Sequence, residues 1–270
     1  MNKDLTPIIV WFRQDLRLKD NPALIAAHEV GKPILPVYIL DDENSGEWKM
    51  GAASRWWLHE SLIALDNSLE GKLCFSKGCA QEILANIIKN TGADIVYWNR
   101  CYEPWRIARD TEIKETLRNL GIEAKSFNGS LLFEPHTTLK KDGTPYKVFT
   151  PFYKKACLSR GIEPRTPEPK PTNLTFYEHT LSSLGDLSLL PNIPWHKQIS
   201  DHWMPGEGGA QKRLSEFLQN GLNGYKEGRD HPARENVSRL SPHLHFGEIH
   251  SQQILYLVSK KFGDLSKISD

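Results

Sequence analysis

The sequence predicts an α/β fold, in which a Rossmann-like domain with a five-stranded parallel sheet is followed by the beginning of an all-α domain. Short apolar runs alternate with amphipathic stretches over the first half, a polar and proline-rich segment follows, and helical periodicity then returns. The 270 residues are 39% hydrophobic and 25% charged, with a net charge of +1, which is typical of a globular chain. Charge alone therefore does not indicate a nucleic acid partner.

Five runs of strand length are mostly apolar or β-branched, as expected of strands buried inside an α/β domain. The run PILPVYIL is the longest of them. We predict strands at residues 7–12, 33–40, 73–76, 94–98 and 123–127.

Amphipathic stretches separate these strands and predict helices. Asn21 and Glu103 each precede a proline at an expected helix start, and Gly31 and Gly92 follow expected helix ends. Because each helix would connect two strands, right-handed crossovers and a parallel sheet are expected. The predicted helices cover residues 21–30, 52–69, 80–90 and 104–120.

The composition changes after about residue 130, and this change predicts the domain organisation. The segments KKDGTPYKVFTPFYKKA and EPRTPEPKPTNLT are rich in proline and polar residues, which disfavours regular structure. Helical periodicity returns after GEGGA, whose glycines we interpret as a turn, and a second helix is expected at 251–262. The predicted units are an α/β domain at 6–135, a connector at 136–200 and a helical domain that begins at 201–270.

Several common sites are missing from the sequence. No GxGxxG follows the first strand and no GxxxxGK[ST] occurs, which disfavours ordinary NAD and P-loop functions. His243, His245 and His250 are interpreted as packing residues, so no metal site is predicted. The four cysteines contain no CxxC pair and the first apolar run is short, so we expect a cytoplasmic protein that does not enter a membrane.

One polar residue near a strand end is a candidate for ligand binding. Glu103 follows the fourth predicted strand and lies among Trp98, Tyr102 and Trp105, where its carboxylate could bind the ring nitrogens of a flat heterocycle. By contrast, the acidic run that starts at Asp41 is interpreted as a solvated loop.

Five segments, in order, resemble motifs of class I DNA photolyases and their cryptochrome relatives. They are WFRQDLRLKDNPAL, GAASRWWLHESLIALD, NRCYEPWRIARD, GTPYKVFTPFYK and SRLSPHLHFGEIH. The resemblance runs from about residue 8 to the end of the sequence and reaches little more than the N-terminal half of such proteins.

This resemblance implies a light-driven enzyme that repairs pyrimidine dimers in DNA. Reduced FAD in the helical domain would give an electron to a flipped-out cyclobutane dimer, and an antenna chromophore would be held in the α/β domain. Such chemistry needs no acid or base residue, so no catalytic residue is expected in this portion. The family is expected to act as a carbon–carbon lyase and as a monomer.

The resemblance also assigns binding residues one by one. The FAD contacts would be Tyr225 and the phosphate loop formed by Val237, Ser238, Arg239, Leu240 and Ser241, where Val237 replaces the usual threonine. Arg229 would contact the DNA backbone. Asn99 and Glu103 match positions that contact 5,10-methenyltetrahydrofolate in some members, while Arg55 lies on a helix that borders 8-hydroxy-5-deazaflavin in others. The resemblance therefore does not decide which of the two antenna chromophores is bound.

Alternatives to a cyclobutane dimer photolyase also follow from the same residues. A cryptochrome would use light to change the flavin redox state and signal to a partner, and a stand-alone module would only bind the antenna chromophore. The 270-residue form is expected to be incomplete and inactive alone. Outside the resemblance, Arg55 is also interpreted as one partner of a surface ion pair with Glu60 or Asp15.

Overall fold

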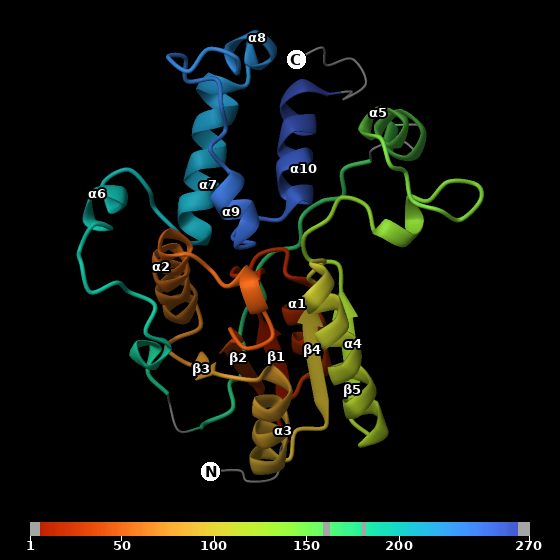
Figure 1. Ribbon diagram of the computed structural model, residues 1–270, viewed down its shortest axis with the longest axis vertical. Coiled ribbons are helices and arrows are strands. Elements are labelled where there is room, and N and C mark those ends of the chain that lie inside the picture. Colours follow the sequence, from red (N-terminus) through yellow and green to blue (C-terminus); the bar gives the residue numbers. More distant parts are fainter. Residues whose placement is uncertain (1–5, 159–162, 180–181, 264–270) are drawn as a thin grey trace.

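The computed structural model describes residues 6–158, 163–179 and 182–263. Its centre is a single parallel sheet with the strand order β3-β2-β1-β4-β5 (Figure 1). The predicted α/β fold with five parallel strands is therefore confirmed. The strands are β1 (Ile8–Phe12), β2 (Ile34–Leu40), β3 (Cys74–Lys77), β4 (Ile95–Asn99) and β5 (Glu123–Phe127).

Helices cover both faces of the sheet. The strand side chains alternate, so that Ile8 and Val10 face one core and Ile9 and Trp11 face the other. Helices α1 and α2 pack on the first core, and α3 and α4 pack on the second. The bounds are α1 (Pro22–Val30), α2 (Ala52–Ser68), α3 (Ala80–Thr91) and α4 (Pro104–Asn119).

The ends of these helices follow from local chemistry. The Asn21 side chain caps α1 by accepting a hydrogen bond from Leu24 N at 3.1 Å. Gly31 ends the same helix with a φ of 77°, a left-handed conformation that glycine adopts without strain. The helix boundaries predicted from these residues are correct within two residues.

The chain between the sheet and the last helices is mostly irregular. Near Phe176 it returns to the start of β2, where Ile34 N donates to Thr175 O at 2.8 Å and Tyr177 N donates to Ile34 O at 2.9 Å. The described short helical turns are η2 (Pro135–Thr137), α5 (Phe149–Pro151), the π-helical η3 (Phe152–Cys157), η5 (Leu184–Leu187) and α6 (Lys197–Ser200).

A group of helices stands beyond the carboxyl ends of the strands (Figure 1). Helix α7 (Glu207–Glu216) continues as the π-helical η6 (Phe217–Gly221), and α8 (Tyr225–Gly228), α9 (Ser241–His245) and α10 (Ser251–Phe262) follow. The bounds of α10 match the prediction.

The start of α7 differs from the prediction, because the glycines of GEGGA were interpreted as a turn. Only Gly206 has a non-helical backbone, with a φ of 97°, and Glu207 already begins the helix. Glu207 accepts hydrogen bonds from Leu18 N at 2.9 Å and Lys19 N at 3.1 Å, so its carboxylate ties the first turn to the segment after β1. Tertiary contacts thus extend the helix through residues of poor helix propensity.

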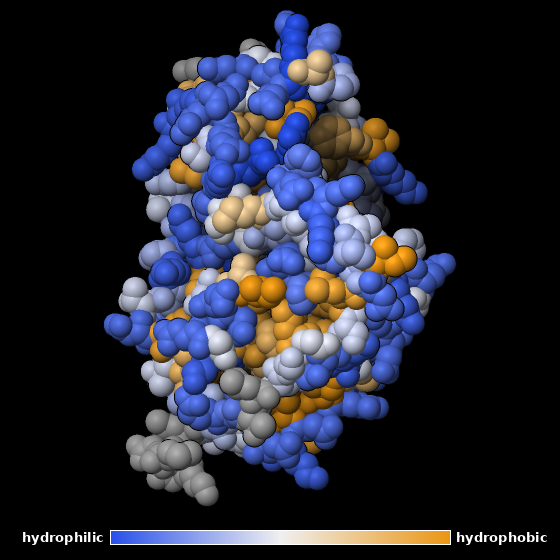
Figure 2. Space-filling view, turned by 90° about the vertical axis from the view of Figure 1, so that its left-hand side faces the viewer, coloured by the Kyte–Doolittle hydropathy of each residue, from blue (hydrophilic) through white to orange (hydrophobic). Residues whose placement is uncertain are grey.

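The face of the molecule in Figure 2 is mostly hydrophilic. Apolar side chains gather in the lower half of that view, the half that contains the sheet, while the part with the last helices is covered mainly by polar groups. Among the described residues no helix is long and apolar enough to cross a membrane.

Candidate functional site

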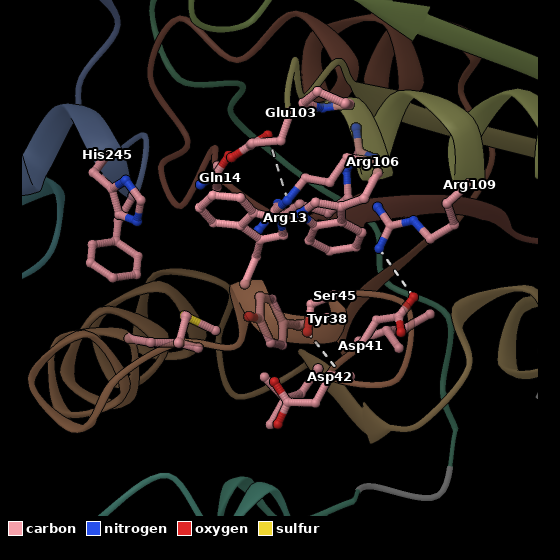
Figure 3. A pocket seen from close by; sticks show the side chains of 18 residues that line it. Arg13, Gln14, Tyr38, Asp41, Asp42, Ser45, Glu103, Arg106, Arg109 and His245 are labelled. Atoms are coloured by element: carbon pink, nitrogen blue, oxygen red, sulfur yellow. Dashed lines mark hydrogen bonds and ion pairs between the residues drawn. The ribbon is translucent and has the colours of Figure 1, made fainter.

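A cavity of about 520 Å³ opens at the carboxyl ends of β1, β2 and β4. Strand β1 lies between β2 and β4, so the connections after β1 and β4 diverge and leave a crevice, the usual place for ligands in open α/β sheets. From the helical part, His245 lies at one side of the cavity (Figure 3), and Phe246 also lines it. The volume is within the range of sites for small molecules.

Polar groups without protein partners face this cavity. Among the described residues, neither the Gln14 amide nor the Tyr38 hydroxyl makes a hydrogen bond, although both residues line the wall. Glu103 precedes the first residue of α4 without a capping hydrogen bond from its side chain, and its carboxylate has only an ion pair with Arg106 at 3.6 Å. Because polar groups in a half-enclosed cavity need partners, this donor and acceptor set suits a polar, planar ligand.

The charged residues of the wall are already paired. Arg13 binds Asp110, Arg109 binds Asp41 at 3.2 Å, and both interactions are largely buried. Asp41, predicted to be solvated, is therefore a buried ion-pair partner. Arg106 has only the looser ion pair with Glu103 at 3.6 Å, and its Nε makes no hydrogen bond.

Arg55 also has a partner that the sequence did not predict. Its guanidinium binds Asp42 at 2.7 Å, and its Nε donates to Met50 O at 3.0 Å, rather than meeting Glu60 or Asp15. The prediction of those two partners is wrong, because the loop after β2 folds back onto the first turn of α2. Arg55 thereby fixes this loop at the edge of the cavity.

Guanidinium groups stack on the Trp105 ring in one wall and on the buried Trp11 ring behind it. The Arg13 guanidinium lies 4.6 Å from the Trp11 ring centroid, and that of Arg109 lies 4.9 Å from Trp11 and 5.0 Å from Trp105. Arg106 covers Trp105 at 4.8 Å. Such stacked cation–π contacts hold the planar groups in fixed orientations, so the wall is organised before any ligand arrives.

Two pKa shifts describe the electrostatics of the cavity. Burial raises the pKa of the Tyr38 hydroxyl well above its usual value, so the group stays protonated and can donate a hydrogen bond. Burial lowers the pKa of His245, although the nearby Glu103 carboxylate works in the opposite direction. The lowered pKa favours the uncharged imidazole, which can both donate and accept a hydrogen bond.

Asn99 lies outside the residues that line the cavity. Its side chain donates to Asp15 at 2.6 Å and to Asn21 at 2.7 Å, and it accepts from Ala23 N at 3.2 Å. These bonds satisfy most of the amide and connect the ends of β1, β4 and α1. The structure thus separates Asn99 from Glu103, although the sequence groups them, and the predicted ligand contact of Asn99 stays a prediction.

The loop at 237–241 has the backbone of an anion site. Arg239 has a left-handed φ of 52°, and Leu240 follows with a right-handed φ of −86°, a pair that turns successive amides toward one concave side. Within the described chain, the amides of Val237, Ser238 and Arg239 have no hydrogen-bond acceptor. These free donors fit the pyrophosphate of a dinucleotide cofactor such as FAD.

The other predicted contacts lie close to this loop in sequence but on a separate short helix. Tyr225 begins α8, is half-buried and packs its ring 5.8 Å from Phe217. The guanidinium of Arg229 covers the Tyr225 ring at 5.8 Å and remains more than half exposed. The two residues are thus brought together, and Arg229 also has a 3.8 Å contact with Asp230.

Sequence reasoning missed most residues of the cavity. Gln14 follows β1 and Tyr38 lies within β2, and both strands were predicted correctly. The sequence therefore already indicated that these two residues lie near the carboxyl edge of the sheet. His245 lies more than 200 residues from Gln14, and no local pattern indicates that it closes the same cavity.

A cavity at the switch point of a five-stranded parallel sheet, with a helical second part beyond the same strand ends, defines the class of this α/β protein. Comparison with protein families matches residues 8–172 to the DNA photolyase family. The chain belongs to this family.

Two relatives known from sequence cover most of the chain. It is 47% identical, over 92% of its length, to the deoxyribodipyrimidine photo-lyase of Agrobacterium fabrum, and 34% identical, over 94%, to cryptochrome-1 of Arabidopsis thaliana. The matches span 52% and 38% of those proteins, respectively, so the chain spans about half or less of their length.

A solved structure agrees with this assignment. The crystal structure of a bacterial class III photolyase from Agrobacterium tumefaciens superposes with a TM-score of 0.87 at 43% identity and covers 98% of this chain and 54% of its own. The predicted membership of class I is not confirmed, because this similar structure is one of class III. The predicted family and fold are confirmed.

Proposed function

We propose that the protein is a light-driven DNA repair flavoprotein, a carbon–carbon lyase that splits cyclobutane pyrimidine dimers. The similarity to a deoxyribodipyrimidine photo-lyase over both the sheet and the helical part carries this proposal. Because the chain spans about half of such relatives, the residues below form one portion of the repair machinery.

We assign the flavin to the 237–241 loop. The amides of Val237, Ser238 and Arg239 and the exposed Ser241 hydroxyl would hold the two phosphates, and Tyr225 would pack beside the cofactor. When bound and excited, reduced FAD supplies the electron that splits the dimer. The buried Leu240 side chain anchors the loop to the helical part. Val237 replaces the usual threonine, so the loop offers the phosphates one hydroxyl group fewer.

Arg229 is assigned to the DNA backbone. Its exposed guanidinium has only a 3.8 Å contact with Asp230 and stacks on Tyr225, so it is oriented but not neutralised by a strong ion pair. A phosphate contact at this position would place DNA next to the flavin loop.

We assign the antenna chromophore to the cavity at the sheet edge, and of the two candidates we favour 5,10-methenyltetrahydrofolate. The pterin ring offers two adjacent N–H donors, from N3 and the 2-amino group, to a single carboxylate such as Glu103. The corresponding ring of 8-hydroxy-5-deazaflavin has one N–H between two carbonyl oxygens, which a carboxylate repels.

The class of photolyase is part of the proposal. The expected class I assignment competes with class III, and the 43% identity to a class III structure over nearly the whole chain favours class III. We further propose a monomeric, cytoplasmic protein, in line with four cysteines that form no disulfide.

A cryptochrome is the second candidate, since the chain is 34% identical to cryptochrome-1 of Arabidopsis thaliana. A cryptochrome would bind the same flavin and change its redox state in light, but it would leave pyrimidine dimers intact. Repair of a damaged oligonucleotide therefore separates the two functions.

The test uses the 270-residue chain and, in parallel, the longest open reading frame that contains it. Each is purified, its bound-flavin absorbance is recorded, and a thymine-dimer oligonucleotide is illuminated in its presence. Light-dependent repair by a flavin-loaded protein supports the photolyase. Flavin photoreduction without repair supports the cryptochrome, and a near-UV pterin absorbance without flavin supports a stand-alone antenna module.

The antenna assignment has its own matched pair of variants. Glu103→Gln keeps the size of the side chain but removes the acceptor charge, and we expect about tenfold weaker folate binding by titration calorimetry. Glu115→Gln, on the exposed side of α4, should bind as the wild type does. Equal affinity of all three proteins would count against the pterin contact of Glu103.

A further inference from the structure

Among the described residues, Trp48, Phe149 and Ile193 are the most exposed large apolar side chains, with 72%, 71% and 71% of their surface accessible, and of these three Trp48 lines the cavity at the sheet edge. It lies on η1 (Gly46–Trp48), in the loop between β2 and α2. An indole costs free energy when it faces water, so a site for a planar partner is a physical reason for such exposure.

The loop that carries Trp48 is held by many polar contacts. The Asp41 carboxylate accepts from Asn44 N at 3.1 Å, Ser45 Oγ donates to Asp42 O at 2.9 Å, and Trp48 N donates to Ser45 O at 2.9 Å. Arg55 joins the loop to α2 through Asp42 and Met50. Little backbone entropy is therefore lost when the Trp48 ring meets a ligand.

A second indole lines the same cavity from the other side of β1. Trp105 begins α4 after β4, whereas Trp48 follows β2, and β1 lies between these strands in the sheet. Trp105 is fixed between the guanidinium groups of Arg106 and Arg109. One wall thus carries an immobilised aromatic ring, and the opposite wall carries an aromatic ring that has no ring partner among the described residues.

We infer that Trp48 is the stacking residue that covers the planar ring of the ligand in this cavity and selects aromatic heterocycles over other polar molecules. The inference rests on the proposed antenna site. The edge of the ring forms hydrogen bonds with the Gln14 amide, the Tyr38 hydroxyl and the Glu103 carboxylate. Trp48 stacks on the face of the ring and shields that face from water. Trp48 is a binding and positioning residue with no role in the repair chemistry.

The expected effect is set by the strength of stacking between an aromatic side chain and a heterocyclic base. Trp48→Ala should weaken binding of 5-formyltetrahydrofolate, a stable reduced folate, by about tenfold or more. Trp48→Phe keeps an aromatic face and should remain within about threefold of the wild type. Because the Trp48 side chain is exposed, both variants should unfold at the temperature of the wild type.

The experiment measures folate affinity by titration calorimetry and the quenching of intrinsic fluorescence in the same samples. Trp195→Ala is the matched control, since Trp195 is 36% exposed and does not line the cavity. It should bind as the wild type does, with unchanged ligand quenching. Both Trp48 variants should lose part of the quenching, because the quenched indole is gone.

The outcomes separate the two levels of the proposal. If the wild type binds folate and Trp48→Ala binds it equally tightly with full quenching, Trp48 does not stack on the ligand and the inference is overturned, while the antenna site stands. If the wild type binds neither the folate nor 8-hydroxy-5-deazaflavin, the antenna proposal fails and the inference fails with it.

Discussion

Glu248 lies between the sheet domain and the last helices and is fully buried. Its carboxylate accepts hydrogen bonds from Trp57 Nε1 at 2.9 Å, from Ser61 Oγ, from Gly206 N at 2.8 Å and from His243 Nδ1. These donors come from α2, from the residue before α7 and from α9. A single carboxylate therefore fixes three elements at one point, and its removal leaves several buried donors without an acceptor.

We expect Glu248→Ala to lower the free energy of unfolding by about 3–5 kcal/mol, the cost of breaking a buried charged network. Chemical denaturation followed by circular dichroism measures this loss. Glu112→Ala on the exposed side of α4 is the control and should change stability by less than about 0.5 kcal/mol. Similar losses in both variants would show that Glu248 is not a structural centre.

His250 gives a second prediction at the scale of one residue. Burial lowers its pKa below the usual 6.5, although the Asp20 carboxylate, 3.3 Å from Nδ1, works in the opposite direction. Between pH 6.5 and that lowered pKa the unfolded chain binds a proton that the folded chain does not. The contribution of neutral His250 to stability is thus complete above pH 6.5 and is lost as the pH falls through this window.

His250→Asn keeps a side chain that can cap α10 and removes this titration. Denaturation curves at pH 7.5, 6.5 and 5.5 should show a shallower decline of stability for the variant than for the wild type. His59 and His245, whose pKa values burial also lowers, titrate in both proteins and leave a residual decline. An unchanged slope would mean that His250 gains its proton equally in both states.

Helix α7 shows how an element can depend on glycine for packing rather than for flexibility. A Cβ atom added to Gly209 would lie 1.6 Å from Met204 O, whereas one added to Gly208 would meet only the end of the Met204 side chain at 4.0 Å. The two glycines are adjacent in the first turns of the same helix, and only one faces the preceding chain. Their helix propensities are equal, so any difference between them is tertiary.

Gly208→Ala should therefore raise the free energy of unfolding by up to about 1 kcal/mol, because alanine is the better helix former. Gly209→Ala should lower it by about 2 kcal/mol or more, because the backbone at Met204 must move. Urea denaturation of both variants tests the pair. The same sign of change in both would mean that α7 does not pack against the Met204 carbonyl.

At the scale of the whole molecule, Arg17 joins the two parts of the chain. The fully buried Arg17 guanidinium donates its hydrogen bonds to backbone carbonyls. Its nitrogens bind Gly247 O at 2.8 Å and Gly129 O at 2.7 Å, so it links the segment after α9 to the end of the sheet domain. Leu16 N adds a bond to Phe246 O at 3.1 Å.

Arg17→Lys retains the charge but loses the planar fork that reaches several carbonyls at once. We expect a loss of about 3 kcal/mol and faster hydrogen exchange in α9 and α10, while amides of β1 and β4 keep their protection. Arg118→Lys on the exposed end of α4 is the control. Uniformly faster exchange in sheet and helices would show that the parts unfold together without a separate Arg17 contact.

The sequence predicted regular elements better than it predicted contacts. Buried strands such as PILPVYIL and the caps Asn21 and Gly31 act through neighbours in the chain, so the sheet and its helices could be placed within two residues. The predicted partners of Arg55 and the predicted turn at the start of α7 were wrong, because both features depend on contacts with other segments of the chain. Glu103 was found because it follows a strand, whereas the place of Asn99 among Asp15, Asn21 and Ala23 required the folded chain.

The sequence by itself determined the parallel α/β fold, the positions of the strands and the membership of the photolyase family, since periodicity, caps and motifs are local properties. Only the tertiary structure decided that Gln14, Tyr38, Glu103 and His245 share one cavity, that its arginines are neutralised in pairs, and that Trp48 stands exposed at its wall. The physical reason is that burial and charge pairing depend on which distant segments pack together, and local sequence patterns do not indicate which segments these are.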